Sequence, residues 1–310
     1  MAARDLRFRK FHGLGNDFIV LEDVLDALLL SAEGARRLCD RHRGIGADGI
    51  LTLLRPRIEG ADYRLHIYNR DGSVPEMCGN GLRCVMRHVA DRMRCSSAVF
   101  DTDAGLRRGS IEGEGDRNVR VGLGDVRLLA SESQLLESSP AVEGVGLSLG
   151  NPHLVLRPLG REDEASGSES IPGASLLMLA QRLGPELERH PRFPDRTNVG
   201  FLRLMKPQTI ELVVFERGAG LTQACGTGAA AAATAACRWG LVCAAEPVVV
   251  HLPGGALEVR VEPFHSASTG GLATSEAGSL LGHVELVGDA QHVFDGAVWV
   301  EGSDLARSVD

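Results

Sequence analysis

The sequence predicts an α+β fold of two pseudo-symmetric repeats, each a largely antiparallel sheet or barrel wrapped around a central helix. The first observation behind this prediction is an internal repeat. Residues 67–81 (IYNRDGSVPEMCGNG) align without a gap with residues 214–228 (VFERGAGLTQACGTG), at an offset of 147. The second is the alanine run from Ala229 to Ala233, directly after the second copy. Alanine has the highest helix propensity, and such small side chains allow a helix to be closely surrounded on all sides.

Further matches keep the same order in both halves. Residues 15–21 (GNDFIVL) match residues 150–156 (GNPHLVL), and residues 49–51 match residues 200–202 more weakly. Chance rarely preserves both sequence and order, so we interpret the chain as two copies of one supersecondary plan.

Local patterns place the individual elements in chain order. Short apolar runs bounded by turn residues predict strands. Ser31 is expected to cap a helix whose apolar residues recur at helical spacing. The predicted strands cover residues 17–21, 50–54, 63–68, 154–157, 248–252 and 256–261, and the predicted helices cover residues 31–43, 81–92 and 228–239.

The repeat also predicts the domain organisation. The first α/β repeat is expected at residues 1–127 and the second at 128–291, and a C-terminal strand at about 292–310 could return to the first. We expect the active site in the cleft between them. Three aperiodic segments are expected to be surface insertions, the first of them a linker between the repeats. They cover residues 131–140, 160–173 and 265–278.

Composition excludes several classes of protein. Lys and Arg total 33 against 41 Asp and Glu, and a net charge of −8 disfavours a nucleic-acid binder, which needs basic surface. No stretch reaches the roughly 18 apolar residues of a membrane span, and no signal peptide is visible at the N-terminus. Seven cysteines are an odd number and a poor disulfide framework. We therefore expect a cytoplasmic protein with neither nucleic-acid nor membrane partners.

Two cysteines occupy equivalent places in the repeat. Cys78 and Cys225 each stand directly before Gly-x-Gly and a predicted helix. Backbone N–H groups and the positive end of the helix dipole favour a thiolate there, which predicts a lowered pKa for both thiols. The glycines allow a ligand carboxylate to approach the same amides. Small residues at tight strand–helix turns would explain one such cysteine, but the repeated pair favours two opposed groups at one site.

The spacing of the two thiols narrows the chemistry. The chain has no C-x-x-C motif of a disulfide oxidoreductase and no zinc-ligand spacing, and no lysine suggests a pyridoxal Schiff base. Proton transfer remains: a thiolate removes a proton from one face of a carbon while a thiol supplies one to the other face. Helix N-termini could stabilise the carbanion formed beside a carboxylate.

Longer motifs surround these cysteines. N-x-D-G-S-x-x-x-M-C-G-N-G-x-R-C covers residues 69–84, and E-R-G-x-G-x-T-x-x-C-G-T-G covers residues 216–228. Together with His12–Phe18 (HGLGNDF), Gly150–His153 (GNPH) and Thr197–Val199 (TNV), they closely resemble the diaminopimelate epimerase family. The resemblance implies interconversion of LL- and meso-diaminopimelate, without pyridoxal phosphate or metal, on the route to lysine and peptidoglycan. It also implies a homodimer, a small-molecule substrate and no cofactor.

The resemblance implies a role for each matching residue. Cys78 and Cys225 match the two catalytic acid/base cysteines, and His153 and Glu216 match residues that tune the thiol pKa values. A second amino-acid head would suit amides and a carboxylate for its ammonium and an arginine for its carboxylate. The substrate-binding positions are Asn16, Asn69, Gly79, Asn80, Asn151, Asn198, Glu216, Arg217, Gly226 and Thr227.

One position departs from the family pattern. Many relatives carry a substrate-contacting glutamine where this chain has Gly49, so that side-chain contact is absent.

The nearest alternative function is a proline or hydroxyproline racemase. The Glu216-Arg217 pair argues against this alternative, because a substrate with one amino-acid head has little use for the pair. A non-catalytic binding protein of the same fold is the other alternative.

Other signals are assigned no chemistry. Residues 44–49 spell GxGxxG, but they follow a helix and precede a strand, the reverse of a dinucleotide site, so we expect a loop. Packing roles are expected for the remaining cysteines, which are Cys39, Cys84, Cys95, Cys237 and Cys243.

Overall fold

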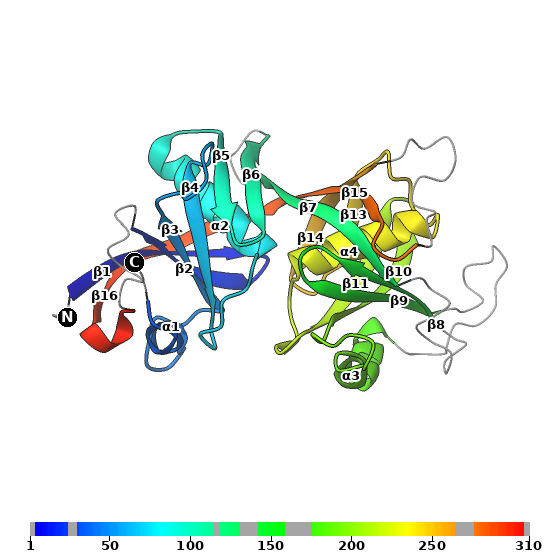
Figure 1. The fold of residues 1–310 in the computed structure, drawn as a ribbon, viewed down its shortest axis with the longest axis horizontal. Helices are drawn as coiled ribbons and strands as arrows, with labels where there is room; N and C mark the ends of the chain where they lie inside the picture. Colours follow the sequence, from blue (N-terminus) through cyan, green and yellow to red (C-terminus); the bar gives the residue numbers. More distant parts are fainter. Residues whose placement is uncertain are drawn as a thin grey trace. The chain divides into compact units, whose positions relative to one another are not determined.

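The computed structural model describes residues 4–23, 30–113, 118–130, 142–158, 175–264 and 276–306. The expected insertions at 131–140 and 160–173, and most of the one at 265–278, lie outside the described residues. The chain separates into two compact units, one formed by residues 1–122 and 287–310 and the other by residues 123–286 (Figure 1).

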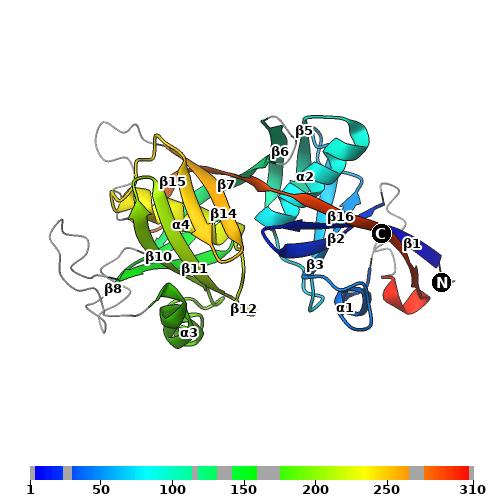
Figure 2. The same cartoon turned by 180° about the vertical axis from the view of Figure 1, so that it is seen from behind.

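The first unit is a mixed, mainly antiparallel sheet with one long helix, α2. Its strand order is β16-β1-β2-β3-β4-β5-β6, continued by the first residues of β7. Only β2–β3 and β4–β5 pair in parallel. Figure 2 shows β16 running beside β1 along its length. The elements are β1 (Arg4–Gly13), β2 (Asn16–Glu22), α1 (Ala32–Cys39), β3 (Gly49–Leu54), β4 (Tyr63–Asn69), α2 (Gly79–Met93), β5 (Ser97–Thr102), β6 (Gly105–Glu112), β7 (Asn118–Ala130), β16 (Gln291–Val300) and the short η3 (Gly302–Asp304).

The second unit repeats this plan and closes it. Its strand order is β7-β8-β9-β10-β11-β13-β14-β15, and β15 also pairs with β7, so the sheet returns on itself as a barrel. Here β9–β10 and β11–β13 are the parallel pairs. The elements are β8 (Val142–Ser148), β9 (Pro152–Pro158), α3 (Leu176–Leu187), β10 (Asn198–Lys206), β11 (Thr209–Glu216), β12 (Gly220–Leu221), α4 (Gly226–Arg238), β13 (Val248–Leu252), β14 (Gly255–Pro263) and β15 (Leu280–Asp289).

The two units match element by element, which confirms the predicted duplication. In the first, α1 connects the parallel strands β2 and β3, and α2 connects β4 and β5. In the second, α3 connects β9 and β10, and α4 connects β11 and β13. Parallel neighbours require such crossovers, so the positions of the helices follow from the pairing.

The outer helices depart from the sequence prediction. The helix predicted at 31–43 ends at Cys39, because Asp40 adopts an extended backbone and its carboxylate accepts the N–H groups of His42 and Arg43. Its counterpart α3 was not predicted, although Ser175 caps it by accepting an N–H from the first turn. The repeat itself, which requires a crossover after β9, was the signal that could have located it.

The central helices are enclosed as predicted. Every residue of α4 from Gly226 to Ala236 is buried, and Figure 1 shows α4 surrounded by the strands of its barrel. Alanine side chains permit this because they leave room for sheet on every side. In the first unit α2 is buried from Gly79 to Met86, including Arg83. Among the described helices, none is long and apolar enough to cross a membrane.

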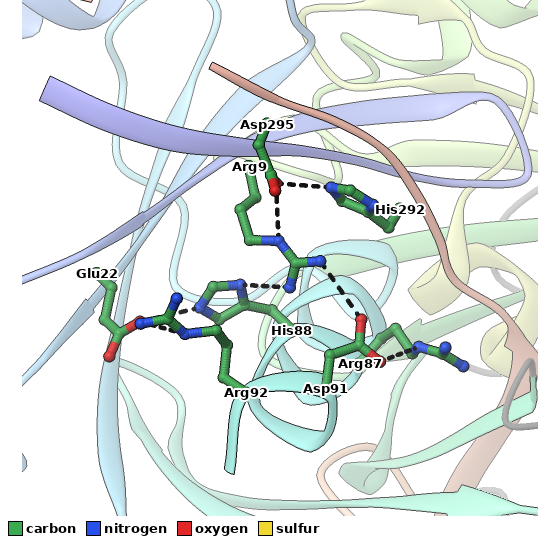
Figure 3. A network of polar contacts seen from close by, with 8 residues as sticks. All are labelled: Arg9, Glu22, Arg87, His88, Asp91, Arg92, His292 and Asp295. Carbon is green, nitrogen blue, oxygen red and sulfur yellow. Dashed lines mark hydrogen bonds and ion pairs between the residues drawn. The ribbon is translucent and has the colours of Figure 1, made fainter. Parts of the chain in front are cut away.

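A polar network fastens the exposed end of α2 to the sheet (Figure 3). Arg9 of β1 lies 3.0 Å from Asp295 of β16 and 3.6 Å from Asp91 of α2. His88 of α2 lies 3.3 Å from Glu22 of β2. These contacts connect the helix to β1 and β2 directly and to β16 through Arg9.

Candidate active site

Both predicted catalytic cysteines are N-cap residues of the central helices. Cys78 precedes α2 with φ −141° and ψ 112°, and Cys225 precedes α4 with φ −129° and ψ 107°. This extended backbone lets a side chain turn back toward the unpaired N–H groups of the first turn. The repeat therefore produces two nearly identical settings for a thiol.

The first half-site lies around Cys78. Its half-buried thiol accepts the Gly81 N–H, with the nitrogen 3.4 Å from Sγ. Asn80 is buried in the first turn of α2, and its amide nitrogen donates to Oδ1 of Asn16 at 3.2 Å. The predicted residues Cys78, Gly79, Asn80 and Asn16 are thus brought together where β2 begins and α2 starts.

Asn69, the remaining predicted residue of this half, has a different setting. It pairs with Gly49 across β4 and β3, at the sheet end where Phe18 of β2 also meets Gly49. Its own side chain is exposed and donates to Ser73 Oγ at 2.9 Å. Asn69 therefore serves as a turn residue here, with its amide hydrogen-bonded within its own turn.

The second half-site is more enclosed. Cys225 is only 5% exposed, and its Sγ lies 3.8 Å from Oγ1 of Thr227. Asn151 donates to the same hydroxyl at 3.4 Å and lies 3.1 Å, through Oδ1, from Nε2 of His153. A Cβ at Gly228 would lie 3.1 Å from Sγ, so a side chain there would push the thiol away from the first turn of α4.

A short loop after β11 carries the charged residues of this half. The backbone N–H of Arg217 donates to Oδ1 of Asn198 at 3.0 Å, while the Asn198 amide donates to the carbonyl of Pro152 at 3.1 Å. The Glu216 carboxylate accepts the Thr222 hydroxyl. Strand pairing explains the assembly, since β9, β10 and β11 are neighbours and their site residues all lie at one end of the sheet.

Burial corrects one expectation about the thiols. The helix end was expected to lower both cysteine pKa values, but for Cys225 this is wrong. Burial raises the pKa of the Cys225 thiol well above its usual value, and the nearby Glu216 carboxylate raises it further. Desolvation opposes the charged form more strongly than one helix terminus favours it, so Cys225 holds its proton.

His153 is likewise held in its neutral form. Burial, assisted by the charge of Arg217, lowers its pKa from 6.5 to about 3. A neutral imidazole with Nε2 beside the Asn151 carbonyl oxygen can donate that N–H, which leaves the Asn151 amide to donate to Thr227. His153 therefore orients Asn151 and contributes no positive charge.

The structure explains the departure at Gly49. A Cβ added there would lie 2.7 Å from the carbonyl oxygen of Tyr68 and 3.3 Å from the ring of Phe18. A backbone atom cannot move aside cheaply, so a glutamine at this position would require the pairing of β3 with β4 to shift. The chain lacks both the glutamine and the room for one.

The cysteines outside the site follow the packing expectation only in part. Cys39 and Cys84 are buried, and burial raises the pKa of Cys39 to about 12. Cys95 and Cys237 are half-buried. Cys243 is exposed in the turn after α4, so the packing role expected for it is wrong.

Sequence reasoning missed two residues next to the first half-site. Asp48 lies in the GxGxxG stretch, which is a loop as predicted, and its carboxylate accepts from Asn16 at 2.9 Å. Arg83 is fully buried and donates to Oδ1 of Asn80 at 2.8 Å. The signal for Arg83 was present, because it is the arginine of the C-G-N-G-x-R-C motif. Within the described ranges, no group of three or more His, Cys, Asp or Glu side chains could hold a metal ion.

Comparison with known proteins identifies the family of the chain. A family model described as diaminopimelate epimerase matches residues 8–129 and 148–274. The diaminopimelate epimerase of Azotobacter vinelandii is 42% identical over 267 residues, which cover 82% of this chain and 90% of that relative. That of Pseudomonas syringae pv. tomato is 39% identical over 283 residues, which cover 87% of this chain and 96% of the relative.

Solved structures of similar fold carry more distant sequences. A probable proline racemase from Agrobacterium radiobacter has a TM-score of 0.68 at 15% identity, covering 94% of this chain and 92% of that one. A hydroxyproline epimerase from Agrobacterium vitis, with bound trans-4-hydroxy-L-proline, has a TM-score of 0.68 at 14% identity, covering 98% and 94%. These structures share the fold, and the family model and sequence relatives establish more: the chain belongs to the diaminopimelate epimerase family.

Proposed function

We propose that this chain is an isomerase that interconverts LL-2,6-diaminopimelate and meso-diaminopimelate without a cofactor, in the supply of lysine and peptidoglycan precursors. One observation carries the proposal: equivalent cysteines cap the central helices of both repeats in a chain that closely matches diaminopimelate epimerases. Two acid/base groups of one chemical kind are what inversion at a carbon requires, since either stereoisomer can be the substrate.

The environments of the two thiols suggest a direction for proton transfer. Cys225 is buried beside Glu216 and keeps its proton, whereas half-buried Cys78 accepts a backbone N–H at its sulfur. In the LL-to-meso direction Cys78 takes the α-proton, so a C–H bond breaks and an S–H bond forms. Cys225 then gives its proton to the opposite face of the same carbon, and the reverse direction exchanges the roles.

The electron pair left on the α-carbon needs a stabilising group. It delocalises into the adjacent carboxylate, which would accept N–H groups from Gly79-Asn80 and Gly226-Thr227 at the two helix starts. A well-placed donor of this kind contributes roughly 3–4 kcal/mol to the transition state. Water exclusion by the buried surroundings of Cys225 strengthens each of these interactions.

The distal amino-acid head of diaminopimelate fits the remaining polar residues. Arg217 would hold its carboxylate in a forked pair, and Glu216 with neighbouring amides would hold its ammonium. The amides proposed for this role are Asn16, Asn69, Asn151 and Asn198. A proline racemase has no second head to bind, so the Glu216-Arg217 pair favours the diaminopimelate reaction over that alternative.

The expected homodimer has a candidate surface. Among the described strands β16 is the last in the sheet order, and it pairs with β1 alone. Its side chains Val293, Phe294 and Trp299 are 52%, 44% and 67% exposed. A second copy of the chain would cover such an apolar edge, and sedimentation velocity can measure the dimer that results.

A cytoplasmic setting is consistent with the state of the cysteines. All seven lie within the described residues, and none of them forms a disulfide.

Proton exchange at the α-carbon tests the reaction. Reduced protein incubated with LL-diaminopimelate in heavy water should produce the meso isomer, with deuterium incorporated at the inverted carbon. L-proline and trans-4-hydroxy-L-proline, assayed in parallel, should exchange no α-proton. Failure of diaminopimelate to isomerise or exchange while both cysteines are reduced would overturn the proposal, and turnover of proline would support the racemase alternative.

A further inference from the structure

A continuous chain of hydrogen bonds runs through the first half-site. Arg83 Nη2 donates to Asn80 Oδ1 at 2.8 Å, and Asn80 Nδ2 donates to Asn16 Oδ1 at 3.2 Å. Asn16 Nδ2 then donates to Asp48 at 2.9 Å, and Asp48 also accepts from Arg41 at 2.9 Å. In the three bonds from Arg83 to Asp48 every donor points in the same direction, from the guanidinium toward the carboxylate, and Arg41 donates to the other oxygen of that carboxylate.

The two ends of this chain determine the orientation of both amides. A guanidinium can only donate, so the atom of Asn80 that faces Arg83 must be its oxygen. A carboxylate can only accept, so the atom of Asn16 that faces Asp48 must be its nitrogen. Either end alone imposes this polarity on both amides, so only the loss of both ends would let the amides rotate by half a turn and exchange oxygen and nitrogen at little cost.

The fold buries the charged guanidinium of Arg83 and so removes it from water. Its side chain is fully buried, and its Nε donates to the backbone carbonyl of Asp289 at 3.1 Å. A Cβ on Gly13 would lie 2.9 Å from Nη2 and 3.3 Å from the Asp289 carbonyl oxygen, so a side chain there would displace the guanidinium. Burying an arginine without a carboxylate partner costs free energy, and the described part of the chain provides no ion pair for it.

The second repeat shows that the fold itself does not require this arginine. By the offset of 147, Arg83 corresponds to Ala230, which is fully buried in α4. By the offset of 135, Gly13 corresponds to Ser148. The same helix in the same architecture is therefore built with an alanine, and the buried guanidinium belongs specifically to the half-site of Cys78.

We propose that Arg83 and Asp48 are positioning residues that lock the Asn80 and Asn16 amides in one orientation, so that both present fixed donors and acceptors to the substrate. The proposal rests on the proposed function, because it takes these amides as substrate contacts. Neither Arg83 nor Asp48 needs to touch the substrate, and each acts through the amide next to it.

Steady-state kinetics of Arg83→Met and Asp48→Asn test this role. Because the amides contact the substrate before and during the reaction, and one remaining end still orients both of them, each single variant should raise KM for LL-diaminopimelate by less than about threefold while kcat changes by less than threefold. The double variant should raise KM by about tenfold or more, beyond the product of the two single effects, because only there does neither end orient the amides. Arg87→Met, on the next turn of α2 and paired with Asp91 (Figure 3), is the matched control and should leave both constants unchanged.

A readout independent of activity separates this proposal from the proposed function. In the substrate-free protein, the side-chain amide resonances of Asn16 should stay near their wild-type positions in Arg83→Met, and they should shift further in the double variant than in Asp48→Asn alone. Double-variant effects that only multiply the single ones, an Asn16 signal that is the same in the double variant and in Asp48→Asn, or a fall in kcat at constant KM would each overturn the proposed positioning role. If the wild type does not epimerise diaminopimelate, the proposed function fails. The NMR measurement still tests whether Arg83 and Asp48 orient the two amides. If Arg83→Met does not fold, Arg83→Gln, whose amide can either donate or accept, replaces it in the single and the double variant.

Discussion

The half-sites around Cys78 and Cys225 share a backbone plan but differ in side-chain chemistry. Asn16 and Asn151 are equivalent by the 135-residue offset, and each amide contacts the second residue of the central helix, Asn80 or Thr227. In the first half the helix residue donates to the strand residue, whereas in the second the strand residue donates to the helix residue. The repeat has thus conserved the contact and reversed its polarity.

The difference extends to the charges that support each contact. The first half-site is anchored by Arg83 and Asp48, while the second has Ala230 and the neutral, buried His153 in its interior. Burial and the nearby Glu216 carboxylate keep the Cys225 thiol protonated, whereas the Cys78 thiol is only half-buried. In the proposed two-base reaction, duplication would supply the pair of thiols and divergence a different setting for each.

The largest expected effect comes from removing either thiol. Cys78→Ala and Cys225→Ala should each abolish epimerisation, lowering kcat by at least about a thousandfold, because one face of the carbon loses its proton donor or acceptor. The measurement is the rate of meso-diaminopimelate formation from the LL isomer. Near wild-type turnover from either variant would contradict the two-base scheme and make one half-site dispensable.

A cysteine on the same helix provides the control for this prediction. Cys237 lies near the end of α4, half-buried and away from the first turn. Cys237→Ala should keep full activity, since it leaves the helix start unchanged. A comparable loss in Cys237→Ala would mean that activity depends on the packing of α4 rather than on the thiol of Cys225.

A pair of equivalent glycines tests the steric difference between the repeats. At Gly49 a Cβ would meet the Tyr68 carbonyl at 2.7 Å, whereas at Gly200 it would meet only Leu212 Cδ1, at 3.3 Å. Gly49→Ala should lower the free energy of unfolding by about 1–3 kcal/mol, because backbone must move to relieve the overlap. Gly200→Ala should cost less than about 1 kcal/mol, because a leucine methyl can turn aside. Urea denaturation of both variants measures the difference, and equal costs would refute the steric explanation for Gly49.

The sequence was sufficient to predict the parts that repeat. Cys78 and Cys225 could be located because Cys-Gly-x-Gly recurs at a constant offset, and the alanine run predicted the enclosed helix α4. Local signals of this kind survive in a single sequence, since capping and helix propensity depend on neighbours in the chain. The same signals placed β2, β3, β4, β9, β13 and β14 to within a few residues, but they left most of the sixteen described strands unassigned.

Properties that depend on distant contacts could not be predicted. The raised pKa of Cys225 results from burial within its barrel and from Glu216, which the helix-end argument did not weigh. The chain of hydrogen bonds through Asn16 joins three separate segments of the sequence. Nothing in the spacing of these segments shows that Arg83 lies at one end of that chain and Asp48 at the other. Helix α3 was missed because a short amphipathic segment containing Pro185 is a weak local signal, even though the repeat required it.

The last prediction concerns the pH dependence of stability, and it tests the contrast between His153 and its equivalent, Phe18. Unfolded His153 would titrate near 6.5, but burial keeps its folded pKa at about 3. Between these values the unfolded state binds more protons, so the stabilising contribution is complete above pH 6.5 and is lost as pH falls. From pH 7 to pH 5 the wild type should lose about 2 kcal/mol more unfolding free energy than His153→Phe, which cannot take up that proton. Loss of the hydrogen bond to Asn151 lowers the stability of His153→Phe at every pH and leaves the slope of unfolding free energy against pH unaffected. As a control, His42→Gln in an exposed turn should keep the wild-type slope. Parallel curves for wild type and His153→Phe would mean that His153 can accept a proton in the folded protein, and the second half-site would then not be the neutral interior that distinguishes it from the first.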